Sequence, residues 1–147
     1  MSFHQLISQS QSLIPFEAPE LEFLLNQSRA NNQRLAITGL LLNTPDGRFL
    51  HVLEGPREAV RALYYQRIAH DPRHYNCQVI GEGPSAVRSF PHSPLAYRAA
   101  QALDLRRLLA PVAVAGAALL VPRPRTRTEL LELLAEFVLG TEPAMVS

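Results

Sequence analysis

The clearest candidate for chemistry in this sequence is a single histidine, His51, in the middle of the otherwise apolar segment GRFLHVLEGP (residues 47–56). An imidazole exchanges protons near neutral pH and can both donate and accept hydrogen bonds. Side chains alternate along a strand, so His51 shares one face with Phe49 and Leu53. These residues leave two interpretations open: a core histidine bonded to a backbone carbonyl or to Ser8, or a residue that contacts a planar ligand.

A pair of amides and two isolated polar side chains offer further candidates. Asn31 and Asn32 follow each other near the end of a predicted helix, where Asn commonly caps the C-terminus. Arg67 lies in a second predicted helix, either as a solvated residue or as a contact to a phosphate or ribose. The single cysteine, Cys77, is expected to be an inert small hydrophobe.

Catalytic and metal-binding patterns are missing from the sequence. It has no G-x-S-x-G nucleophile motif and no glycine-rich loop that could cradle a phosphate. Its five histidines show no close ligand spacing. We therefore expect no enzymatic activity and no bound metal.

The composition is that of a small globular protein. The 147 residues are 47% hydrophobic and 18% charged, and the net charge of +1 gives no electrostatic case for nucleic acid or for an anionic membrane. One cysteine and the lack of a secretion signal favour a reducing, cytoplasmic location. The most apolar window, residues 108–121, is too short for a membrane span and contains proline and glycine.

Hydrophobic periodicity and turn residues predict an α+β fold. The expected order is strand, helix, strand, strand, helix, strand, strand, which is typical of a ferredoxin-like sheet with two helices on one face. The predicted ranges are 3–9, 17–31, 35–43, 48–54, 57–71, 76–82 and 86–90. In this topology the first and third strands are neighbours. Ser8 and His51 are therefore expected to face the same space between the two helices.

The C-terminal third is predicted to be helical. Residues 97–109 and 126–139 have amphipathic patterns, with Thr126 or Thr128 as a candidate cap of the second helix. Residues 121–125, VPRPR, are expected to form a stiff linker between them. We divide the chain into a domain of residues 1–97 and a helical extension of residues 98–147. The extension is expected to pack on the exposed sheet face or to form an oligomer interface.

Several local strings resemble one known family, the BLUF domain, a flavin-binding blue-light sensor. The strings lie within residues 3–97, in the family's order and at nearly its spacing. They are LI.QS from Leu6, QSRANN....ITGLLL from Gln27, DGRFL.VLEGP from Asp46, RI..DPRH from Arg67 and RSFP from Arg88.

The resemblance implies a flavin (FAD or FMN) whose ring lies between the two helices. It implies that Asn31 and Asn32 hydrogen-bond the ring edge, since one amide offers both a donor and an acceptor. Arg67 matches a basic position that the family uses near the flavin. The second helix is one residue longer than usual before this position, which rotates Arg67 by about 100° unless a bulge absorbs the extra residue.

The same resemblance shows where this chain departs from the family. Ser8 stands where the family has a photoactive tyrosine, and His51 stands where it has a glutamine. Serine has no accessible one-electron oxidation, and an imidazole cannot repeat the rearrangement of an amide. The family's Trp/Met segment after the RSFP string is also missing, and the chain contains no Trp.

The sequence therefore favours a BLUF-like flavin-binding regulatory protein in which normal blue-light photochemistry is lost. The alternative is a flavin-free protein–protein interaction module on the same fold. In either case we expect the protein to act through a separate protein partner and to form homo-oligomers.

Overall fold

A computed structural model describes residues 3–13, 16–115 and 120–140 of the chain. The N-terminal half contains β1 (Phe3–Ser12), α1 (Ala18–Arg34), β2 (Thr38–Asn43), β3 (Arg48–Gly55), α2 (Arg57–Ala62), the π-helix η1 (Leu63–Arg67) and the 3₁₀-helix η2 (Ile68–His70). The remainder contains β4 (His74–Ser85), β5 (Ala96–Ala99), α3 (Ala102–Leu108), β6 (Val112–Ala115), β7 (Leu120–Arg123) and α4 (Arg127–Gly140).

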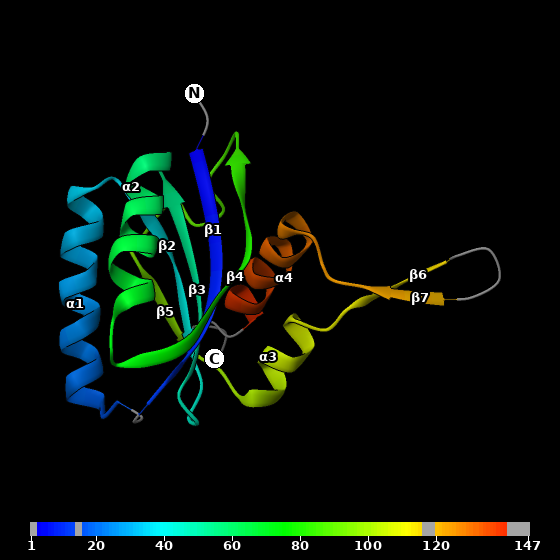
Figure 1. The fold of residues 1–147 in the computed structure, drawn as a ribbon, viewed down its shortest axis with the longest axis horizontal. Coiled ribbons are helices and arrows are strands. Elements are labelled where there is room, and N and C mark those ends of the chain that lie inside the picture. The colour runs from blue at the N-terminus through cyan, green and yellow to red at the C-terminus, as the bar shows by residue number, and fades with distance from the viewer. Residues whose placement is uncertain (1–2, 14–15, 116–119, 141–147) are drawn as a thin grey trace, which may run out of the picture.

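The main sheet has five strands in the order β4-β1-β3-β2-β5. The first four have the strand order of a ferredoxin-like sheet, with β1 and β3 antiparallel neighbours at its centre, as the sequence predicts. Helices α1 and α2 cover one face of this sheet, and α3 and α4 lie on the other (Figure 1). The fold class expected from the hydrophobic pattern is therefore confirmed.

A tight turn sets the register of the central hairpin. Thr44 and Gly47 close the β2–β3 connection through a bond from Gly47 N to the Thr44 carbonyl of 2.9 Å, and Gly47 takes a positive φ of 88°. Glycine adopts this left-handed conformation without a steric penalty, which explains the TPDG sequence of the turn. The resulting β3 lies against β1 so that Ser8 is directly opposite His51.

Residues 86–90 do not form the predicted strand. Strand β4 instead continues through Pro84 to Ser85, which is tolerated because β4 lies at the sheet edge and needs no outward donor there. The following segment is held by the buried carboxylate of Glu54, which accepts backbone N–H bonds from Ser89 at 2.6 Å and Phe90 at 2.7 Å. These donors are used by a side chain, so they are not available to a strand ladder.

The predicted helix over residues 97–109 is also wrong in its first part. Residues 96–99 form β5, which pairs parallel to β2. The N–H of Ala100 donates to the Asn43 carbonyl at 2.9 Å, and the Gln101 N–H then donates to the Asp104 carboxylate at 2.8 Å. This second bond marks the start of a helix, so α3 is shorter than the amphipathic pattern suggests.

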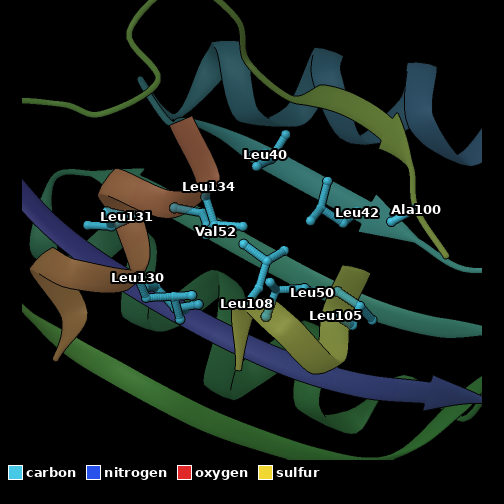
Figure 2. Close-up of a cluster of buried hydrophobic side chains, with 11 residues drawn as sticks. Leu40, Leu42, Leu50, Val52, Ala100, Leu105, Leu108, Leu130, Leu131 and Leu134 are labelled. Atoms are coloured by element: carbon cyan, nitrogen blue, oxygen red, sulfur yellow. The ribbon is translucent and has the colours of Figure 1, made fainter. Parts of the chain in front are cut away.

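The C-terminal helices share a hydrophobic core with the sheet face opposite α1 and α2. Leucines of α3 and α4 point toward the leucines and valine of β2 and β3 (Figure 2). The buried members of this cluster are Ile7, Leu40, Leu42, Leu50, Val52, Ala100, Leu105, Leu108, Leu130, Leu131 and Leu134. The division of the chain at residues 97 and 98 stays a prediction.

Residues 121–125 do not form a simple linker. Strands β6 and β7 pair as an antiparallel hairpin that extends away from the main sheet (Figure 1). Helix α4 then begins at a cap in which the Glu129 N–H donates to the Thr126 hydroxyl at 3.2 Å and the Thr126 N–H donates to the Glu129 carboxylate at 2.8 Å. In the described part of the chain, no helix has the length and apolar composition needed to cross a membrane.

Candidate functional site

A cavity of about 240 Å³ opens between α1 and η1, above β1 and β3. Its wall combines apolar and aromatic side chains with polar ones, as in sites that bury an organic ligand and fix its orientation. The apolar and aromatic lining comes from Phe16, Leu24, Leu25, Leu41, Phe49, Leu63, Tyr64, Ile68 and Leu95. The polar lining includes Ser8, Gln9, Asn31, Asn32, His51, Arg67, Asp71, Arg73, His74 and Cys77.

The structure brings all five site residues proposed from the sequence to this one cavity. Ser8 lies on β1 and His51 on β3, while Asn31 and Asn32 belong to the last turn of α1. Arg67 ends η1 on the other side of the opening. These residues come from four separate elements, so their meeting follows from the tertiary fold.

His51 faces the cavity with one ring nitrogen unpaired. Its Nε2 is buried, and no atom of the described residues makes a hydrogen bond to it. Burial, with a smaller effect of the nearby His74, lowers the pKa of His51 from 6.5 to about 4. The imidazole is therefore neutral at physiological pH. An ordinary core histidine would bond to Ser8 or to a backbone carbonyl. Nε2 of His51 makes neither bond.

The two asparagines differ in what holds them. Asn32 is only 2% exposed, and its Nδ2 donates to the Pro94 carbonyl at 2.9 Å, which fixes the amide plane. The Oδ1 of Asn32 has no partner among the described residues. Asn31 accepts a bond from Arg34 through its Oδ1. Neither side chain caps the end of α1, where the N–H of Leu35 donates to backbone carbonyls instead.

A π-helical turn brings Arg67 to the cavity. In η1 the N–H of Ile68 donates to the carbonyls of Leu63 and Tyr64, so the turn is widened to a spacing of five residues. This is the kind of bulge that absorbs one extra residue in a helix. Arg67 is itself exposed at the cavity rim, with no hydrogen-bond partner among the described residues.

Tyr64 is a cavity residue that the sequence does not single out, because its position in a helical apolar stripe is typical of packing. It is 3% exposed and belongs to the core cluster with Leu6 and Leu53. Burial raises the pKa of its phenol to about 12, and the neighbouring Ser8 hydroxyl partly offsets this rise in pKa. Tyr64 therefore stays protonated beside the residue that replaces the expected strand tyrosine.

The far side of the cavity carries a second group of polar residues that sequence spacing does not reveal. Cys77 Sγ lies 3.1 Å from His74 Nδ1. Burial raises the pKa of the Cys77 thiol and lowers the pKa of His74. Both groups are therefore neutral near pH 7. Across the described residues, no group of three or more His, Cys, Asp or Glu side chains could hold a metal ion.

The fold and this cavity define the class of protein: a ferredoxin-like sheet with two helices on one face and a cavity between them. Residues 3–96 match the family described as sensors of blue-light using FAD, abbreviated BLUF. That match covers well over half of the chain, so the protein belongs to the BLUF family.

Curated relatives with detectable sequence similarity are light-activated enzymes of which this chain matches a small part. The photoactivated adenylate cyclase subunit beta of Euglena gracilis is 35% identical over 82 residues, which are 56% of this chain and 9% of that protein. The subunit of the same description in Euglena longa is 34% identical over 82 residues, again 56% of this chain and 9% of that protein.

Solved BLUF structures are similar over most of the chain. BlrB, a BLUF protein in its dark state, has a TM-score of 0.63 at 29% identity and covers 73% of this chain and 78% of its own. BlsA in its photo-activated state has a TM-score of 0.63 at 26% identity, covering 74% and 76%. A bacterial light-regulated adenylyl cyclase has a TM-score of 0.62 at 31% identity, covering 66% of this chain and 28% of its own.

Proposed function

We propose that this protein binds a flavin, FAD or FMN, in the cavity between α1 and η1 and acts as a regulatory protein without the usual BLUF light switch. The observation that carries the proposal is that Ser8, Asn31, Asn32, His51 and Arg67 all line one cavity. Membership of a family of sensors that use FAD supports a flavin as the ligand.

The polar atoms of the cavity fit the edge of a flavin ring. Such a ring, when bound, supplies a blue-absorbing plane whose edge alternates carbonyl acceptors and N–H donors. Oδ1 of Asn32 is an unpaired acceptor, and Nε2 of His51 is a buried nitrogen without a partner. Leaving a buried polar group unpaired costs about 1–3 kcal/mol. A ligand that pairs it is therefore favoured at this place.

The apolar and basic parts of the cavity fit the rest of the ligand. Leucines of α1 and η1 would pack on the two faces of the ring, while exposed Arg67 stands at the rim where a ribityl phosphate would leave the cavity. A cavity of about 240 Å³ has room for the ring, with the phosphate-bearing chain directed outward.

The loss of the light switch follows from two side chains. Ser8 offers no phenol from β1, and the neutral imidazole of His51 has no amide that can flip. We therefore propose that illumination of the flavin-loaded protein leaves no persistent red-shifted spectrum.

Flavin uptake by the purified chain is the direct test. Protein is incubated with FAD, FMN or riboflavin and separated by gel filtration, and the absorbance of the flavin in the protein peak is measured. The proposal expects the flavin to elute with the protein. A protein that stays colourless with all three flavins would contradict the proposal and favour the flavin-free interaction module.

A matched pair of variants shows whether the flavin is in this cavity. Ser28 lines the cavity from an exposed position on α1, and Asn26 is exposed on the same helix outside the lining. Ser28→Trp should weaken flavin binding by at least about tenfold, equal to 1.4 kcal/mol, whereas Asn26→Trp should leave it unchanged. Equal effects of the two substitutions would place the flavin elsewhere.

A separate protein partner and self-association remain part of this proposal. The matched region makes up 28% of the chain of the solved light-regulated adenylyl cyclase.

A further inference from the structure

Glu82 of β4 is the centre of a polar cluster that lies outside the cavity lining. Its Oε1 accepts a hydrogen bond from the Tyr65 hydroxyl at 2.9 Å, and its Oε2 accepts bonds from His4 Nε2 at 2.7 Å and from the Arg61 guanidinium. The Cζ of Arg61 also lies 4.8 Å from the centre of the Tyr65 ring. Side chains from β1, α2 and η1 are therefore joined at one carboxylate of β4.

The cluster keeps this carboxylate ionised. The Glu82 side chain is 17% exposed. Burial raises its pKa, but the bonds from His4, Tyr65 and Arg61 outweigh burial, so the pKa of Glu82 lies below its ordinary value. An ionised carboxylate only accepts hydrogen bonds, which fits the three donors around it, and bonds to a charged group are stronger than bonds between neutral groups. Glu82 is therefore a firm anchor for the helix above it.

The anchor and the cavity lie on different sides of the same helical segment. Arg61 and Tyr65 are four residues apart, so they share one side of the segment formed by α2 and η1. The residues of η1 and η2 that line the cavity are Leu63, Tyr64, Arg67 and Ile68. Tyr64 and Tyr65 are consecutive, and their rings meet edge to face with centroids 5.0 Å apart at 89°. The contact to Glu82 is thus one residue away from the cavity wall.

The widened turn of η1 places this anchor in the middle of the wall. The N–H of Ile68 donates to the carbonyls of Leu63 and Tyr64, and Tyr65 lies inside the turn that these bonds close. Turns of this width are rare in helices and are frequent at functional sites. Because the Tyr65 hydroxyl is bonded to Glu82, the turn is tied to the sheet at its centre.

We propose that Glu82 is a positioning residue of this cavity, which acts by holding Arg61 and Tyr65 and so fixes η1 against the sheet. Tyr64 and Arg67 are thereby held where they face a bound ring and its phosphate-bearing chain. This inference rests on the proposed flavin binding. It gives β4 a part in the site through a residue that does not touch the ligand.

FAD affinity of two variants tests this role. Tyr65→Phe keeps the ring beneath Arg61 but removes the bond to Glu82, and it should weaken FAD binding by about fivefold, as expected for the loss of one supporting hydrogen bond. Glu82→Gln should weaken binding at least as much. Because the two residues act through one contact, the double variant should bind FAD no more weakly than Glu82→Gln alone.

Matched controls separate the contact from the type of residue changed. Tyr75 is 51% exposed on the same strand as Glu82, and Glu58 is exposed on α2. Tyr75→Phe and Glu58→Gln should both leave FAD affinity unchanged. Equal effects of these substitutions and of Tyr65→Phe and Glu82→Gln would overturn the proposal.

A spectroscopic signature distinguishes positioning from a loss of stability. The visible circular dichroism of bound FAD, measured at saturation, reports how the ring is held, and it should change in Tyr65→Phe and Glu82→Gln. Leu134→Ala removes a fully buried side chain from the opposite face of the sheet and should leave this spectrum and the FAD affinity as in the wild type. Identical behaviour of Leu134→Ala and Glu82→Gln would mean that Glu82 has only a structural role.

Hydrogen exchange of the flavin-free protein gives a readout that does not depend on the proposed function. The amide of Ile68 closes the widened turn and should exchange several-fold faster in Glu82→Gln than in the wild type. Unchanged exchange would overturn the role of Glu82 in holding η1. If the wild type binds no FAD, the proposed function is wrong and Glu82 positions no flavin site, whereas faster exchange of Ile68 would still show that Glu82 holds the turn.

Discussion

Ser8 of β1 and His51 of β3 lie directly opposite each other in the antiparallel register at the centre of the sheet. Both side chains line the same cavity, and Nε2 of His51 has no hydrogen-bond partner among the described residues. Residues that face each other across two central strands form a fixed pair, because the register of a half-buried sheet is strongly specified. This pair therefore decides what the strands present to a ligand.

Restoring the family's pair should restore a light response only when space is made for it. Ser8→Tyr adds a second phenol to a cavity that Ser8 and Tyr64 already line together. We expect Ser8→Tyr with His51→Gln to give little or no persistent red shift, and the same pair with Tyr64→Leu to give a clear one. The measurement is the light-minus-dark absorption spectrum of each FAD-loaded variant.

The control for this series keeps the imidazole. Ser8→Tyr with Tyr64→Leu but with His51 unchanged should show no persistent shift, because the amide is still missing. A full shift in the variant that retains Tyr64 would mean that Tyr64 does not occupy this space.

His51 should make stability sensitive to acid. The unfolded chain binds a proton at His51 below pH 6.5, whereas the folded protein binds it only below about pH 4. The contribution of His51 to the free energy of unfolding is therefore greatest above pH 6.5 and falls as the pH drops toward 4. Between pH 7 and pH 4.5 we expect the free energy of unfolding to fall by about 2 kcal/mol more in the wild type than in His51→Gln.

Urea unfolding at the two pH values measures this difference. The exposed His70 on η2 provides the matched control, and His70→Gln should follow the wild type. An equal loss in His51→Gln and in the wild type would mean that His51 is protonated as readily in the folded protein as in the unfolded chain.

Glu54 should be essential for the segment that follows β4. Its carboxylate is 0% exposed and accepts bonds from Gln5 Nε2 at 2.7 Å and from the N–H groups of Ser89 and Phe90. Glu54→Gln replaces one acceptor oxygen by a donor, which we expect to cost about 3 kcal/mol in urea unfolding.

Hydrogen exchange locates the effect of this change. The amides of Ser89 and Phe90 should exchange much faster in Glu54→Gln. Glu22→Gln, on the exposed side of α1, should change neither stability nor exchange. Unchanged protection of both amides in Glu54→Gln would contradict the assigned contact.

Helix α4 should contribute to the stability of the whole sheet. Leu134 is 0% exposed in the cluster with Leu50 and Val52, whereas Leu139 on the same helix is 69% exposed. Leu134→Ala should lower the free energy of unfolding by about 3 kcal/mol, and Leu139→Ala by less than about 0.5 kcal/mol. Equal small effects in denaturant unfolding would mean that α4 is only loosely attached.

The sequence predicts the central part of this fold well because its signals are local. Apolar alternation and the TPDG turn predict the β2–β3 hairpin, and the strand order places Ser8 beside His51. Local patterns fail where a distant residue decides the structure. Residues 86–90 look like a strand, but the carboxylate of Glu54 takes their donors.

The site shows the same limit. Family motifs indicate Asn31, Asn32 and Arg67, and the structure shows that they line one cavity. The bond of Asn32 to Pro94 and the widened turn of η1 have no local signal, because each depends on how separate elements pack. The sequence alone predicts Tyr64 to be a packing residue, for the same reason.

The light-minus-dark absorption spectrum of the wild-type protein loaded with FAD tests the central claim most directly. The account predicts that the flavin elutes with the protein. Its absorption bands in the blue should return to the same positions once illumination ends. A red-shifted spectrum that persists after the light is switched off and then recovers in darkness would contradict it, because Ser8 and His51 would then support the switch that their chemistry excludes.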